Sequence, residues 1–307
     1  MIILITGNHG FVGKILTTYL KNKAYTTLGV SRNPIKYNEI SYKALTPEVW
    51  SNSTAIVHLA GKAHDFKKVS NPKGYYEANY ELTKQLFDDF LASESAIFIF
   101  MSTVKAVADN IKGVLTEDSI PYPKTHYGIS KLHAEEYILS QEVPQGKRVF
   151  VLRPCMIHGT GNKGNLNLLY QLVSKGLPWP LGAFHNQRSF CSIDNVCYVI
   201  NQILEREDIL SGVYNLADDE TLSTNDLIKL IAATTNKKAR IFPISKKLIN
   251  KIVKIGDVLH LPLNTERLDK LTENFVVSNA KIKSALQIEK FPISAKEGLI
   301  KTIKSFD

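Results

Sequence analysis

The first thirteen residues constrain the fold most, because an apolar run leads directly into a turn with three spaced glycines. Residues 1–6 read as a buried strand, Gly7, Gly10 and Gly13 follow in the turn, and a helical pattern covers residues 11–22. Without side chains, such a turn lets the backbone approach a pyrophosphate, and the helix N-terminus offers free N–H groups to bind it. The first gap is two residues, unlike the single residue of Gly-x-Gly-x-x-Gly, so a simple turn is the alternative.

The rest of the first half alternates strand and helix patterns. The expected strands are residues 24–30, 55–59, 96–101, 148–152 and 212–216, and the expected helices are 76–92 and a segment starting near His126. This alternation predicts an α/β fold with a doubly wound parallel sheet, a Rossmann-type domain. Its ligands should bind at the carboxyl ends of the strands.

After Pro154 the character of the chain changes. Residues 159–187 are rich in Gly, Asn and Pro, and the segment after 220 shows helical patterns with little strand. We expect a dinucleotide-binding domain of residues 1–158, completed by about 188–217. Residues 159–187 and 218–307 should form a smaller, mostly helical C-terminal substrate-binding lobe.

Composition excludes several classes of protein. No apolar run approaches the roughly 20 residues that span a bilayer, so membrane insertion is not expected. Cys155, Cys191 and Cys197 lack metal-ligand spacing and fit reduced thiols of a cytoplasmic protein, with no metal site. The formal charge of +9 fits solvated lysines or a field that attracts an anionic substrate. The lysines do not alternate with aromatics, so nucleic acid is not an expected partner.

Tyr127 and Lys131 are four residues apart and should share one helix face. A cation so close favours the phenolate, which would make the tyrosine an acid/base near neutral pH. Thr103 follows a buried strand, where its hydroxyl can reach a ligand, and Ser102 is its competitor. Each feature also has a purely structural interpretation. The Ser102-Thr103 pair could form a turn or a helix cap, and the Tyr127–Lys131 spacing occurs by chance on amphipathic helices. Their occurrence together with the upstream glycine turn favours a functional site.

The end of the second strand should select the cofactor. NAD enzymes carry an acid there that binds the ribose 2′-hydroxyl, whereas this chain has Ser31-Arg32. A guanidinium and a hydroxyl suit a 2′-phosphate. We therefore favour NADP(H) over NAD(H), with an exposed loop arginine as the alternative.

Together these features resemble the extended short-chain dehydrogenases/reductases of the nucleotide-sugar, NAD-dependent epimerase/dehydratase type. The matching elements are residues 6–13, 57–61, 77–80, 102–103, 127–131, 152–154 and 188–190. The resemblance implies that Tyr127 is the catalytic acid/base and that Lys131 is its partner and holds the nicotinamide ribose. It implies Thr103 as a hydroxyl that bonds the substrate, and Asn79 as a structural or relay residue. The cofactor-binding residues so expected are Gly7, His9, Gly10, Phe11, Val12, Gly13, Ser31, Arg32, Leu59, Ala60, Gly61, Asn79, Tyr127, Lys131 and Pro154.

The second half resembles bacterial reductases and epimerases of surface-polysaccharide pathways, such as those of O-antigen. The resemblance is nearest to 4-reductases of UDP-4-keto-6-deoxy-N-acetylhexosamines, which make UDP-N-acetylquinovosamine. It implies that Arg188 grips the diphosphate and that Asn165 lies near the uracil. Arg267 is a second phosphate ligand or a surface charge, and His158 replaces a frequent tyrosine of the pocket wall. A homodimer through helices near 80–92 and 126–140 is also implied.

Three hypotheses follow. The first is NADPH-dependent reduction of the C4 ketone of a UDP-sugar, and the second is a UDP-hexose 4-epimerase similar to UDP-glucose 4-epimerase. The third is a non-catalytic NADP-sensing or RNA-associated module, against which the intact Thr103, Tyr127 and Lys131 argue.

Overall fold

The computed structural model describes residues 1–63, 72–162, 165–258 and 264–306. Its centre is a seven-stranded sheet in the order β10-β7-β5-β4-β1-β2-β3, with every neighbouring pair parallel. The strands are β1 (Ile2–Thr6), β2 (Thr26–Ser31), β3 (Glu39–Ser41), β4 (Ala55–His58), β5 (Ile97–Met101), β7 (Arg148–Pro154) and β10 (Gly212–Leu216). The strand order reverses at β1, between β2 and β4, which is where such sheets bind ligands.

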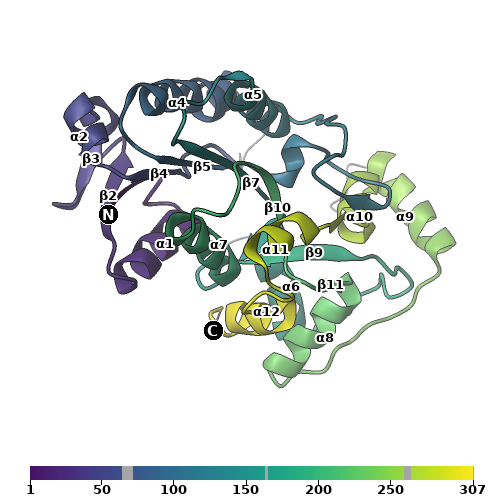
Figure 1. Cartoon of the computed structure of the whole chain (residues 1–307). Helices are drawn as coiled ribbons and strands as arrows, with labels where there is room; N and C mark the ends of the chain where they lie inside the picture. The colour runs from purple at the N-terminus through teal and green to yellow at the C-terminus, as the bar shows by residue number, and fades with distance from the viewer. Residues whose placement is uncertain (64–71, 163–164, 259–263, 307) are drawn as a thin grey trace.

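Helices cover both faces of this sheet. Figure 1 shows α1 (Phe11–Asn22) and α7 (Ile193–Glu205) on one face, and α4 (Leu82–Ala92) and α5 (His126–Ser140) on the other. Because successive residues of a strand point to opposite faces, Ile3 and Ile5 join the core under α1 and α7. Leu4 joins the core under α4 and α5. The predicted doubly wound parallel sheet is confirmed.

The C-terminal lobe has its own core, in which Trp179, Phe190 and Ile231 are buried. Its small sheet is β11-β9-β8, formed by β8 (Met156–His158), β9 (Arg188–Ser192) and β11 (Thr221–Leu222). Its helices are α6 (Asn165–Ser174), α8 (Thr224–Thr234), α9 (Lys246–Val258), α10 (Thr265–Thr272) and α12 (Ala295–Lys304). The small two-stranded sheet pairs β6 (Val114–Leu115) with β12 (Val276–Val277).

The sequence division placed all of residues 218–307 in this lobe, but side chains from residues 275–291, beginning with Phe275 and Val277, pack in the core under α1 and α7. Helix α11 (Ala280–Leu286) contacts β10, and Ile282 and Phe291 lie in the core under α1 and α7. An edge strand needs cover, and α11 supplies it for β10. Within the described residues, no helix has the length and apolar character needed to cross a bilayer.

Candidate active site

The glycine turn after β1 requires its glycines. Gly7 has a φ of +68°, and a Cβ added there would lie 2.8 Å from the Ala60 nitrogen. At Gly13 an added Cβ would lie 2.3 Å from the Gly7 carbonyl oxygen. Helix α1 starts with Phe11 and Val12, receives no side-chain cap from Gly10, and has no acid in its first turn. Its first N–H groups and positive dipole end therefore fit a dinucleotide pyrophosphate.

A buried hydrogen-bond network joins the ends of β1 and β4 at the strand-order reversal. Thr83 donates to the Asn79 carbonyl (2.7 Å), so its oxygen must accept from His58 Nε2 (2.9 Å). His58 Nδ1 then accepts from the Thr6 hydroxyl (2.7 Å), whose oxygen accepts from both N–H groups of Leu59-Ala60 (3.1 Å each). Burial lowers the pKa of His58 to about 3, which keeps the ring neutral as this pattern requires. The network fixes the loop after β4 against the glycine turn.

The three expected catalytic side chains gather at the carboxyl end of β5. Thr103 follows β5 and is buried, and its hydroxyl lies close enough to the half-buried Tyr127, on the first turn of α5, to lower the pKa of the phenol. One helical turn further on, Lys131 is buried, and its Nζ donates to the Met101 carbonyl oxygen (2.9 Å). The sequence and the fold thus bring a hydroxyl, a phenol and an ammonium to one edge of the sheet.

The electrostatics differ from the sequence expectation. Burial raises the pKa of Tyr127, and the neighbouring Thr103 hydroxyl lowers it only in part. The Lys131 ammonium donates to the Met101 carbonyl oxygen, and a lowering of the Tyr127 pKa by Lys131 stays a prediction. Burial also lowers the pKa of Lys131 to about 8, while Glu135 raises it.

Ser102, the competitor of Thr103, is engaged elsewhere. Its hydroxyl donates to the buried carboxylate of Glu135, which also binds Arg153 Nε at 3.1 and 3.0 Å. This ion pair lies beneath Lys131, one helical turn along α5. Thr103 is therefore the hydroxyl that remains available beside Tyr127.

Asn79 is fully buried in η2 (Glu77–Glu81), a short π-helix between α3 (Lys73–Tyr76) and α4. Its Oδ1 accepts from Lys62 N (2.7 Å), and its Nδ2 donates to Lys62 O (3.0 Å) and to Ser130 Oγ (2.9 Å). At Gly61, an added Cβ would lie 2.7 Å from Asn79 Oδ1 and 3.2 Å from Lys131 Nζ. Asn79 thus ties the loop after β4 to the helix that carries Tyr127 and Lys131, a structural role.

At the end of β2, Ser31 is buried, and among the described residues its Oγ has no hydrogen-bond partner. Arg32 next to it is exposed. A buried hydroxyl without a partner costs free energy, so it fits a ligand that supplies one. These two residues lie where the sequence placed the cofactor-selecting group.

Sequence reasoning missed Glu39, whose carboxylate lies beside the glycine turn. It accepts from Asn8 Nδ2 (2.9 Å), His9 Nε2 (3.0 Å) and the Ile35 backbone N–H (2.7 Å). Burial raises the pKa of Glu39, but these backbone and His9 bonds outweigh burial and hold it below its usual range. Glu39 reaches this place because β3 pairs with β2 opposite Gly29, where an added Cβ would lie 2.5 Å from Asn8 Nδ2. No local pattern in the sequence signals such a pairing.

The expected substrate residues are spread over the lobe. Arg188 begins β9, and its guanidinium lies 3.6 Å from the Glu273 carboxylate. Burial lowers the pKa of Arg188, and Glu273 raises it. Asn165 begins α6 and Arg267 lies in α10, but both side chains fall outside what the structure describes. Pro154, which was expected at the cofactor and not at the substrate, is buried at the end of β7.

The resemblance placed His158 where related proteins often have a tyrosine in the wall of the substrate pocket, but the structure buries this side chain inside the lobe. It is buried, its Nδ1 lies 3.0 Å from Thr302 Oγ1, and its Nε2 lies 3.3 Å from Asp218 Oδ2. Thr302 belongs to α12, so this histidine joins β8 to the C-terminal helix. Its role in the structure is to connect elements of the lobe.

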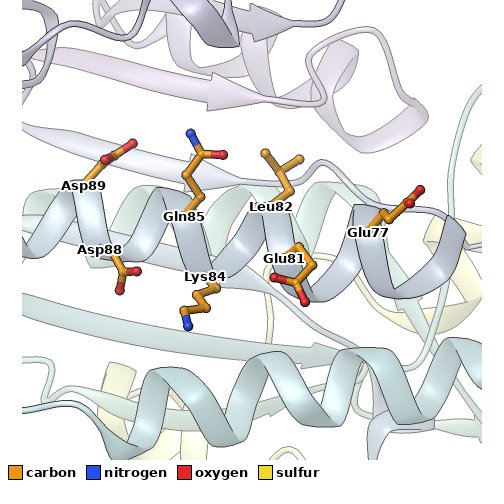
Figure 2. Close-up of a pocket in the computed structure, with 7 residues that line it drawn as sticks. All are labelled: Glu77, Glu81, Leu82, Lys84, Gln85, Asp88 and Asp89. Atoms are coloured by element: carbon orange, nitrogen blue, oxygen red, sulfur yellow. The ribbon is translucent and has the colours of Figure 1, made fainter. Parts of the chain in front are cut away.

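A surface hollow of about 530 Å³ lies away from these groups, along η2 and α4 (Figure 2). It is lined by Glu77, Glu81, Leu82, Lys84, Gln85, Asp88 and Asp89. On its α5 side, Asp88 accepts from the Tyr137 hydroxyl, and Lys84 lies 5.0 Å from the Tyr137 ring. None of the expected site residues lines the hollow. The homodimer expected through α4 and α5, which include this surface, stays a prediction.

The parallel sheet, the glycine turn before the uncapped helix α1 and the Thr103–Tyr127–Lys131 group are the fold and the arrangement of residues that the resemblance predicted. The chain belongs to the NAD dependent epimerase/dehydratase family, whose model matches residues 3–217. It is an enzyme of the nucleotide-sugar class of that family, as the resemblance predicted. The non-catalytic alternative is therefore not supported.

Relatives in this family span both expected chemistries. The chain is 29% identical to the UDP-glucose 4-epimerase of Vibrio cholerae, over 99% of this chain and 95% of the relative. It is 26% identical to the GDP-6-deoxy-D-mannose reductase of Pseudomonas aeruginosa, over 75% of this chain and 79% of the relative. The structure of UDP-glucuronic acid 4-epimerase from Bacillus cereus in complex with NAD aligns with a TM-score of 0.76 at 20% identity, covering 100% and 98% of the two chains.

Proposed function

We propose that this protein is an NAD-dependent 4-epimerase of a UDP-hexose. Sequence reasoning ranked an NADPH-dependent reductase first, and the position of Glu39 reverses that order. Its carboxylate bonds Asn8 and His9 of the turn that would hold the cofactor. A negative charge there repels a 2′-phosphate and is compatible with a free ribose hydroxyl. The similarity to a UDP-glucose 4-epimerase over nearly the whole chain supports the same choice.

The chain provides each group that C4 chemistry needs. Bound NAD would supply reversible hydride acceptance at C4, and inversion at C4 requires that the hydride return to the opposite face of the C4 ketone after the sugar has turned in the site. To accept the proton of the C4 hydroxyl and later give it back, Tyr127 must be a phenolate, so positive charge in the loaded site has to offset the rise of its pKa by burial, and Thr103 shares the C4 oxygen. The buried ammonium of Lys131 supplies positive potential beside this edge of the sheet. Arg188 binds the diphosphate away from C4, which positions the sugar and exchanges its contact with Glu273 for the phosphate.

A second candidate is the NADPH-dependent reduction of a UDP-4-keto-6-deoxy-N-acetylhexosamine. The observation that favours it is the pairing of the unpartnered Ser31 hydroxyl with the exposed Arg32 guanidinium at the end of β2. Such groups suit a 2′-phosphate. The same Thr103, Tyr127 and Lys131 would serve, with the proton moving once, from Tyr127 to the new C4 oxygen.

Cofactor retention separates these two functions. An epimerase regenerates its cofactor in place, so protein purified without added nucleotide should carry bound NAD and interconvert UDP-glucose and UDP-galactose, or their N-acetyl forms. Stoichiometric oxidation of NADPH with a UDP-4-keto sugar, without epimerisation, would show that the reductase is correct.

The cofactor argument has its own test. Glu39→Gln should improve NADP binding relative to NAD by at least about tenfold, since it removes one unit charge near the phosphate. Glu48→Gln, an exposed carboxylate on α2 (Pro47–Ser51), is the matched control and should leave the ratio unchanged. An unchanged ratio in Glu39→Gln would show that this carboxylate does not select the cofactor.

A further inference from the structure

Helix α9 carries an apolar stripe that its own lobe does not cover. Ile249 and Val253 are buried and attach the helix to the lobe core. Leu248, Ile252 and Ile255 remain 51%, 42% and 57% exposed. Their spacing of four and three residues places these three on one face of the helix. An amphipathic helix that only packed on its own protein would keep this face polar.

A stripe of lysines runs beside the apolar stripe. Lys247, Lys251 and Lys254 are exposed and have the same spacing, each one residue earlier in the chain. One residue corresponds to about 100° of helical rotation, so the two stripes lie next to each other along α9. This is the arrangement of helices that lie in the plane of a membrane surface, with apolar side chains among the acyl chains and lysines at the headgroups.

The positive charge of the protein is concentrated in this segment. Residues 236–258 contain seven basic residues and a single acid, a formal charge of +6 within a chain of +9. The acid, Asp257, accepts from the Thr265 backbone N–H (2.9 Å) at the start of α10 and so is directed to the protein. Just before α9, Phe242 is 52% exposed and adds a further apolar side chain. The positive charge of this segment favours an anionic partner. The exposed apolar side chains favour a partner that has an apolar layer beneath its charged groups.

We propose that α9 is a docking surface for an anionic lipid bilayer, on which it lies parallel to the membrane plane. Figure 1 shows α9 at the periphery of the C-terminal lobe, and it packs against α10 on its inner side. The helix is not long and apolar enough to span the bilayer, so the contact is peripheral. Docking would hold the substrate lobe at a membrane surface, independently of which sugar reaction the site performs.

Vesicle sedimentation tests this surface. The full-length protein should bind phosphatidylcholine vesicles that contain phosphatidylglycerol, bind phosphatidylcholine alone far more weakly, and be released by salt. The triple variant K247Q/K251Q/K254Q should lose roughly a hundredfold in partitioning. K21Q/K23Q/K296Q removes the same charge from exposed lysines elsewhere and is the matched control, expected to lose at most a few fold.

The apolar stripe needs a separate variant. L248S/I252S/I255S should lose at least about tenfold in partitioning while its thermal unfolding stays close to that of the wild type, because these side chains are exposed. As an independent readout, Ile252→Cys can be labelled with a polarity-sensitive dye, since the three native cysteines are buried. Its emission should shift to the blue with the anionic vesicles.

Three results would overturn the proposal. One is the absence of binding to anionic vesicles, and another is binding that neither α9 variant changes. The third is self-association of the wild type that L248S/I252S/I255S abolishes without any vesicle binding, which would make a second copy of the chain the occupant of this surface.

Discussion

Replacing Lys131 by methionine is expected to stabilise the protein while removing its chemistry. Burial moves the pKa of this lysine from 10.5 to about 8. Because one pKa unit equals about 1.4 kcal/mol, the charged lysine costs roughly 3 kcal/mol in the folded state at neutral pH. Methionine has a similar shape and no charge, but it loses the hydrogen bond to the Met101 carbonyl, worth about 1 kcal/mol. The net gain should be about 2 kcal/mol at pH 7.

The pH dependence of this gain is its signature. Below pH 8 the lysine is protonated in both states, so the cost is constant. Between pH 8 and 10.5 the unfolded state binds more protons, so wild-type stability from this group rises with pH. By pH 9.5 the wild type should have recovered about 2 kcal/mol, and the advantage of Lys131→Met should disappear.

Urea unfolding of cofactor-free protein at pH 7 and pH 9.5 measures this difference. Trp50 and Trp179 are buried in the first domain and in the lobe, so their fluorescence follows both. Lys131→Arg is the control: it keeps a charge at both pH values and should be less stable than wild type at each. The reasoning is refuted if Lys131→Met is no more stable at pH 7, or if its advantage does not change with pH.

Four other predictions concern residues in and around the site. Tyr127→Phe should lower turnover about 10²- to 10⁴-fold with cofactor affinity unchanged, and near-normal turnover would remove its assignment as acid/base. Glu135→Gln should cost about 3–5 kcal/mol in urea unfolding by leaving Arg153 buried and unpaired, and adding Arg153→Met should recover most of it. With its pKa lowered to about 3, His58 should make stability fall by up to about 1.4 kcal/mol per pH unit below pH 6.5, a slope that His58→Gln lacks. Arg188→Ala should raise KM for a UDP-sugar about ten- to a hundredfold, whereas a loss of stability at constant KM would indicate a structural role.

Local patterns predicted most of the first domain. The helix at 11–22 and the strand at 212–216 have the predicted bounds, because buried strands and amphipathic helices carry their periodicity within a few residues. The glycine turn and the placement of Tyr127 and Lys131 on one helix also follow from short-range spacing. The sequence likewise indicated the family to which the chain belongs.

Other features depend on residues far apart in the chain. The Ser102 hydroxyl is engaged by Glu135, 33 residues further along the chain, and this favours Thr103 as the hydroxyl beside Tyr127. The position of His158 was decided by Thr302, 144 residues away. A side chain's partners at such separations are set by packing, which no local pattern records.

The sequence by itself therefore determined the sheet, the turn and the helix that carries Tyr127 and Lys131, since each is specified by neighbouring residues. Only the tertiary structure decided which groups surround them. It placed Glu39 beside the glycine turn by pairing β3 with β2, and this changed the expected cofactor. It also left Leu248, Ile252 and Ile255 uncovered, because the lobe core is filled from the adjacent face of α9. Burial is a property of the assembled fold, and the same apolar spacing in the sequence serves equally well for a core or for a surface.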